Sequence, residues 1–244
     1  MIKAIFFDAA GILYTRSGPT EAFALDLLRK FGFPTGVSPD LQKSQFALRS
    51  QANEGKISHE AYWDNFLLMR NVIDPMQRKD FSLQIINYSN DIQPIQGAKE
   101  ALAKLKKLGF RLGIITDTMY PVKWKMRRLE KAGVAEFIDV VACSTDLGAH
   151  KPDPAVYMYA IQQANLTPAE SAFVGHLGVE LGAGAKPMDV SSQLPQLQPP
   201  PPSGDRTIPF AGTVLSQQLG RRLYQLETAP RLMSHIEMCP PSPR

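Results

Sequence analysis

Cysteine is scarce in this sequence, and long apolar runs are missing. The 244 residues contain two cysteines, Cys143 and Cys239, which form neither the framework of a disulfide-rich domain nor a zinc-binding pattern. No apolar run approaches the roughly 20 residues of a membrane-spanning helix. The apolar N-terminal run is interrupted by Asp8, which argues against a signal peptide. We therefore expect an intracellular, cytoplasmic protein without a membrane partner.

An excess of one charge is also lacking. Lys and Arg number 27 against 23 Asp and Glu, and a net charge of +4 is too small to indicate a nucleic-acid partner. The run from Lys123 to Arg128 mixes basic and aromatic residues, and we interpret it as a solvated helix face with Trp124 and Met126 partly packed. Hydrophobic residues make up 44% of the chain, which is typical of a globular protein.

Lysine disappears in the last quarter of the chain, where proline accumulates. Residues 1–186 contain all 14 lysines, and residues 187–244 contain 11 of the 20 prolines. Residues 187–205 include Pro199 to Pro202 in succession, a composition that predicts a disordered insert or linker rather than a packed core. Order could return in an edge strand at 207–210 and a helix within 215–238.

The rest of the chain alternates between strand and helix patterns. An apolar run at 2–8 and others at 111–116, 137–143 and 171–175 are typical of buried parallel strands. Helical patterns at 97–108, 121–132 and 154–164 lie between them. This alternation predicts an α/β fold: a three-layer, Rossmann-like parallel sheet core.

One segment interrupts that alternation after the first strand. Residues 19–32 show a helical pattern, and residues 38–93, with Ser58 as a good helix N-cap, show apolar residues at helical spacing and read as a further module of about four helices. We therefore predict an α/β core made of residues 1–14 and 95–186, which could resume over 206–238. The helices of residues 15–94 would form a separate cap inserted into it.

Polar residues stand at the carboxyl ends of the expected strands, where open parallel sheets bind ligands. Asp8 ends the first strand, Thr116 the second and His176 the fourth, while Lys151 follows the third in the loop HKPDP. Their order along the chain is more informative than any one of them.

The segments FFDAAGILYT, GIITDT, HKPDPAVY and FVGHLGVELGAGAK, with a helical segment after the first, resemble the haloacid dehalogenase (HAD) superfamily of hydrolases. The resemblance implies that Asp8 is a nucleophile forming an aspartyl intermediate. It implies that Thr116 binds a phosphoryl oxygen and that Lys151 steadies Asp8 and the transferring charge. From its position beside Thr116, we also expect Asp117 to face the substrate.

The resemblance also implies a Mg²⁺ ion held by Asp8, the backbone carbonyl of Ala10 and Glu180, since Mg²⁺ prefers oxygen ligands. Three positions depart from the pattern of the family's phosphatases. Ala10 replaces a second aspartate that serves as general acid and base, a loss worth about 10²- to 10⁴-fold. His176 replaces a carboxylate with an imidazole, a poorer Mg²⁺ ligand, and Ile12 removes a hydroxyl.

These observations predict a HAD-like hydrolase that acts on a small phosphorylated metabolite through Asp8. The alternative is a catalytically weakened HAD-fold protein that binds a ligand or partner. A 2-haloacid dehalogenase is a lesser alternative, although that branch usually has Ser-Asn where this chain has Thr116-Asp117. So is a phosphonoacetaldehyde hydrolase, which would need Lys43 or Lys56 as a Schiff-base lysine. The sequence leaves the substrate and the oligomeric state open.

Overall fold

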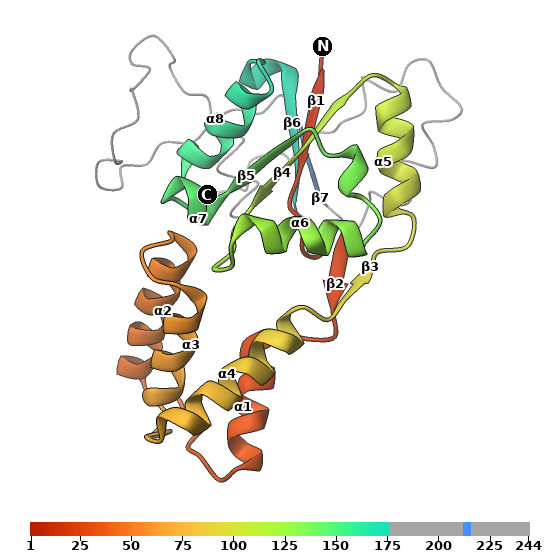
Figure 1. The fold of residues 1–244 in the computed structure, drawn as a ribbon. Helices are drawn as coiled ribbons and strands as arrows, with labels where there is room; N and C mark the ends of the chain where they lie inside the picture. Colours follow the sequence, from red (N-terminus) through yellow and green to blue (C-terminus); the bar gives the residue numbers. More distant parts are fainter. Residues whose placement is uncertain (176–211, 216–244) are drawn as a thin grey trace, which may run out of the picture.

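A five-stranded parallel sheet forms the centre of the molecule (Figure 1). The computed structural model describes residues 1–175 and the backbone of 212–215. The sheet order is β5-β4-β1-β6-β7, and every neighbouring pair is parallel. The strands are β1 (Ala4–Phe7), β4 (Arg111–Thr116), β5 (Val140–Cys143), β6 (Ser171–Gly175) and β7 (Gly212–Leu215). The first strand in sequence therefore lies in the middle of the sheet.

Helices cover both faces of this sheet, because the strands are apolar on both sides. Phe6 packs with α8 (Pro154–Gln163) on one face, where the short α7 (Ser144–Leu147) also lies. Phe7 packs on the other face with α5 (Ala98–Lys107) and α6 (Val122–Lys131). The 3₁₀ turns η1 (Ala135–Phe137) and η2 (Pro168–Glu170) precede β5 and β6. The three-layer α/β core expected from the sequence is thus confirmed.

Four helices, here called the helical insert, separate β1 from the rest of the core. They are α1 (Thr20–Lys30), α2 (Pro39–Asn53), α3 (His59–Leu68) and α4 (Pro75–Ser89), so residues 38–93 form three helices where about four were predicted. The chain enters and leaves them through β2 (Tyr14–Arg16) and β3 (Ile92–Pro94), which pair antiparallel. Ser38, Ser58 and Asp74 cap α2, α3 and α4 by accepting hydrogen bonds from first-turn amides. The insert has its own apolar core around Trp63 and Phe66.

Two predicted strands are shorter in the structure, and the one expected at 2–8 spans only Ala4–Phe7. The strand expected at 137–143 begins only at Val140, because Phe137 belongs to η1 and the Asp139 carboxylate accepts a 2.8 Å hydrogen bond from the Leu112 amide. In the tail, the strand that the structure describes is 212–215. The predicted strand at 207–210 lies outside the described residues. The predicted insert at 187–205 also lies outside the described residues. So does the helix predicted within 215–238, apart from residue 215, which ends β7.

The basic run on α6 is not a uniformly solvated face, and that prediction is wrong for two residues. Lys125 and Arg128 are buried. The Lys125 ammonium donates a 3.0 Å hydrogen bond to the Tyr14 hydroxyl of β2, and Arg128 donates one of 2.9 Å to the Asn90 side chain after α4. Both basic residues therefore hold α6 against the two chain segments that lead into and out of the helical insert.

None of the helices that the structure describes is long and apolar enough to cross a membrane.

Candidate active site

A buried ion pair lies where β1 ends. Asp8 follows β1 directly, and its Oδ1 atom is 3.2 Å from the Nζ atom of Lys151. The same oxygen accepts a 2.8 Å hydrogen bond from the Ala9 amide, while the Asp8 amide donates to the Val174 carbonyl of β6. Burying two charges costs free energy that their attraction often fails to offset, so such a pair at a ligand-binding edge indicates chemistry rather than stability.

Lys151 joins this aspartate to a second one. The backbone amide of Lys151 donates a 3.0 Å hydrogen bond to Oδ1 of Asp117, which follows the last residue of β4, the buried Thr116. Burial raises the pKa of Asp117, and the Lys151 charge and amide oppose this effect. The structure thus brings Asp8, Asp117 and Lys151 together, and it places Thr116 at the same edge of the sheet.

The implied magnesium ligands are only partly described. Asp8 and the backbone of Ala10 lie at the strand-end edge, whereas His176 and Glu180 lie outside the described residues. Among the residues that the structure does describe, no three His, Cys, Asp or Glu side chains gather as metal ligands. These residues by themselves therefore do not complete an octahedral Mg²⁺ site, and no chemical step below is assigned to the ion.

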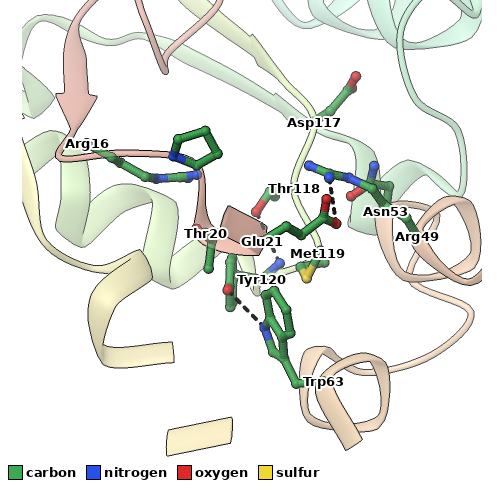
Figure 2. A pocket seen from close by; sticks show the side chains of 11 residues that line it. Arg16, Thr20, Glu21, Arg49, Asn53, Trp63, Asp117, Thr118, Met119 and Tyr120 are labelled. Carbon is green, nitrogen blue, oxygen red and sulfur yellow. Dashed lines mark hydrogen bonds and ion pairs between the residues drawn. The ribbon is translucent and has the colours of Figure 1, made fainter. Parts of the chain in front are cut away.

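A pocket of about 300 Å³ lies between this edge and the helical insert (Figure 2). The loop after β4 forms its core side, and α1, α2, α3 and the chain around β2 form the opposite side. The lining residues are Arg16, Pro19, Thr20, Glu21, Arg49, Asn53, Trp63, Asp117, Thr118, Met119 and Tyr120. The pocket is therefore built jointly by the core and the insert.

The wall on the insert side is polar and hydrogen-bonded. Arg49 of α2 donates a 2.7 Å hydrogen bond to Glu21 of α1, and the hydroxyl of Tyr62 donates one of 2.5 Å to the same carboxylate. Burial and the neighbouring Glu21 charge raise the pKa of Tyr62, which keeps its hydroxyl a donor. This network fixes charged groups at the pocket surface.

The floor of the pocket connects the two parts of the molecule. Tyr120, in the loop after β4, stacks on Trp124 with ring centroids 5.5 Å apart and accepts a 3.2 Å hydrogen bond from the indole of Trp63. The Thr118 amide donates a 3.0 Å hydrogen bond to the hydroxyl of Ser144 at the start of α7. The loop after Thr116 thus extends into the apolar core of the helical insert.

A second contact joins the insert to the loop that carries Lys151. The ring of His150 lies 3.3 Å from the hydroxyl of Ser50 and 3.7 Å from the carboxylate of Glu54, both at the end of α2. No motif in the sequence identified this contact or the pocket residues Arg16, Glu21 and Arg49. Helical spacing alone does not show which polar residues of two separate helices will meet.

The fold and this edge define a class: a parallel α/β enzyme core with a carboxylate–lysine centre beside a helical insert. The family described as haloacid dehalogenase-like hydrolase matches residues 25–186, and the chain belongs to this family. The predicted resemblance and the hydrolase class are therefore confirmed.

Several known proteins are similar to this chain. It is 30% identical over 183 residues to a glyceraldehyde 3-phosphate phosphatase of Pyrococcus abyssi, covering 72% of this chain and 73% of that protein. It is 25% identical over 181 residues to a protein of the same name from Methanopyrus kandleri, covering 72% and 76%.

Two solved structures show the same fold. The magnesium-bound HAD-hydrolase YfnB of Bacillus subtilis has a TM-score of 0.52 at 18% identity, covering 73% of this chain and 82% of that one. The L-2-haloacid dehalogenase of Xanthobacter autotrophicus has a TM-score of 0.50 at 21% identity, covering 75% and 73%. Similarity at these identities shows the fold alone, and a fold does not specify the reaction.

Proposed function

We propose that this protein is a phosphatase that hydrolyses a small phosphorylated metabolite through Asp8. The observation that carries the proposal is the buried Asp8 carboxylate at the end of the central strand, with the Lys151 ammonium 3.2 Å away. An Asp8 oxygen would attack the phosphorus and form an aspartyl phosphate that water then hydrolyses. Lys151 would orient the attacking carboxylate and stabilise the charge of the transferring group, with Thr116 as a hydrogen-bond donor to a phosphoryl oxygen.

The pocket supports a small, polar substrate. Its volume of about 300 Å³ lies at the lower end of the range of ligand sites. Polar side chains in the pocket lining offer hydrogen-bond donors and acceptors for hydroxyl or carbonyl groups of a substrate. They belong to Arg16, Glu21, Arg49 and Asn53. The names of the archaeal relatives point in the same direction, so glyceraldehyde 3-phosphate is the first substrate to test.

Mg²⁺ held by Asp8, the Ala10 carbonyl and Glu180 stays a prediction, as does the cytoplasmic location. Chelation tests the first: if the ion is required, EDTA will abolish phosphate release and added Mg²⁺ will restore it.

The test of the function uses the full chain with a panel of small phosphate monoesters and Mg²⁺. We expect phosphate release by the wild type and none by Asp8→Asn, whose side chain keeps the size of aspartate but is not nucleophilic. Mass spectrometry of an acid-quenched reaction would detect the aspartyl phosphate on the peptide that contains Asp8. Equal phosphate release by wild type and Asp8→Asn, or none by either, would exclude the proposal.

Ala10 specifically favours the alternative of a weakened, ligand-binding protein, because its methyl group transfers no proton. In that case calorimetry would detect binding of a phosphate monoester without turnover. Ala10→Asp would then raise the rate, since it adds a carboxyl group two residues after Asp8.

A further inference from the structure

Cleavage of a phosphate ester requires a proton transfer that neither Asp8 nor Ala10 can supply. The oxygen that leaves an alkyl phosphate needs a proton, and the water that hydrolyses the intermediate must lose one. Asp8 acts as the nucleophile in the proposed reaction, and Ala10 has no titratable group. If the protein is a phosphatase, another group at this edge must carry the proton.

We propose that Asp117 is the general acid and base of this reaction. The inference rests on the proposed function and extends it. Asp117 lines the pocket at its core end (Figure 2), where the carboxyl ends of the adjacent parallel strands β1 and β4 meet. Lys151 connects it to the nucleophile, with its amide 3.0 Å from Oδ1 of Asp117 and its ammonium 3.2 Å from Oδ1 of Asp8.

Among the residues that the structure describes, the groups next to Asp117 suit this role less well. The Lys151 ammonium is bound to Asp8. The two ring nitrogens of His150 lie 2.8 Å from the Lys151 carbonyl and 3.3 Å from the Ser50 hydroxyl, and His150 is not among the pocket-lining residues. The Oδ1 atom of Asp117 accepts the hydrogen bond from the Lys151 amide. The Oδ2 atom is therefore the one that would carry the proton.

The electrostatic surroundings agree with that role. Burial and the negative charge of Asp8 raise the pKa of Asp117, while Lys151 and His150 oppose them, and the net direction is upward. An elevated pKa lets the carboxyl group hold its proton closer to neutral pH, which a general acid requires.

The proton balance closes over one cycle. As an Asp8 oxygen bonds to phosphorus, the bond from phosphorus to the leaving oxygen breaks, and that oxygen takes the proton of Asp117 and departs as an alcohol. The Asp117 carboxylate then takes a proton from the water that attacks the aspartyl phosphate. Inorganic phosphate leaves, Asp8 is again a carboxylate and Asp117 is again protonated.

The test compares two leaving groups in the full chain carrying Asp117→Asn. The amide oxygen can still accept from the Lys151 amide, so we expect the fold and melting temperature to be preserved. Turnover of an alkyl phosphate should fall by about 10²- to 10⁴-fold. Single-turnover release of 4-nitrophenolate from 4-nitrophenyl phosphate should be nearly unchanged, because that anion leaves without a proton. The matched control is Asp146→Asn, an exposed residue of α7, with wild-type kinetics expected.

The pH profile gives a second readout that a merely structural residue would not move. In the wild type, the turnover rate of the alkyl phosphate should fall with rising pH as Asp117 loses its proton. In Asp117→Asn this fall should be absent. An equal loss on both substrates, or wild-type turnover of the alkyl phosphate, would overturn the role of Asp117 while leaving the phosphatase proposal intact. A wild type inactive on both substrates would instead overturn the proposed function and this role with it.

Discussion

The two ends of β1 carry the same kind of ion pair in opposite environments. Just before the strand, Lys3 lies 2.6 Å from Glu170, with side chains 60% and 26% exposed. Just after it, Lys151 lies 3.2 Å from Asp8, with side chains 1% and 9% exposed. Water screens the first pair, which can contribute little. The second pair has lost its hydration, so each partner depends on the other.

Removing the nucleophile should have the largest effect on activity. Asp8→Asn is expected to lower kcat by at least roughly 10⁴-fold, because the proposed covalent step is lost. The neutral amide keeps an oxygen that can accept from Lys151 and the Ala9 amide, so we expect binding of substrate to persist. Stopped-flow kinetics and equilibrium binding would separate these effects, and loss of binding with retained kcat would contradict the assignment.

Lysine-to-methionine changes at both ends of β1 test the comparison directly. Lys151→Met leaves a buried carboxylate without its ammonium, which should cost about 3–5 kcal/mol of unfolding free energy and lower the melting temperature by about 10 °C. Activity should fall by about 10²-fold or more. Lys3→Met is the matched control and should stay within about 2 °C of wild type. Similar shifts in the two variants would show that burial does not distinguish the pairs.

The ion pair between Arg49 and Glu21 on the pocket wall should affect substrate binding more than the rate of the chemical step. Arg49 and Glu21 are 52% and 38% exposed, so Arg49→Gln should change stability by less than about 1 kcal/mol. Loss of one donor to the substrate should raise KM about 10-fold with kcat nearly unchanged. Arg29→Gln, in the exposed pair with Asp26 on the same insert, is the control. A fall in kcat at constant KM would refute a role in substrate recognition.

The smallest effect should be a pH dependence at the exposed end of β1. Hydrogen bonds from Lys3 and Thr167 lower the pKa of Glu170 to about 2 from 4.5. Because the folded pKa lies below the unfolded one, Glu170 contributes stability above pH 4.5, and this contribution is lost as pH falls toward about 2. In Glu170→Gln the melting temperature should fall less steeply over that window. Parallel curves for the two proteins would show no such linkage.

The core and the strand-end residues could be predicted because each depends on local pattern. Strands 111–116 and 171–175 were predicted at the bounds that the structure gives, since both are short, buried apolar runs after a helix. Gly109, with a φ of +85°, ends the helix before the first of them. The convergence of Asp8, Thr116 and Lys151 at one edge follows from the parallel direction of the strands.

Residues whose partners lie far away in sequence could not be predicted. Lys125 and Arg128 look like surface residues until β2 and the end of α4 fold over them and supply Tyr14 and Asn90. The pocket wall likewise depends on how α1 and α2 meet, and neither Glu21 nor Arg49 lies in a recognisable motif. Burial of a long basic side chain is decided by tertiary structure.

The central place of β1 has a consequence for the order of folding during synthesis. This strand is made first, yet its hydrogen-bonding neighbours β4 and β6 follow only at 111–116 and 171–175. The four helices of the insert are all synthesised before β4, although their apolar core also takes in Met119 and Tyr120 from the loop after β4. A nascent chain halted before residue 171 would contain Asp8, Asp117 and Lys151 with the three strands that precede them, but β1 would still lack its neighbour β6 and would be an edge strand.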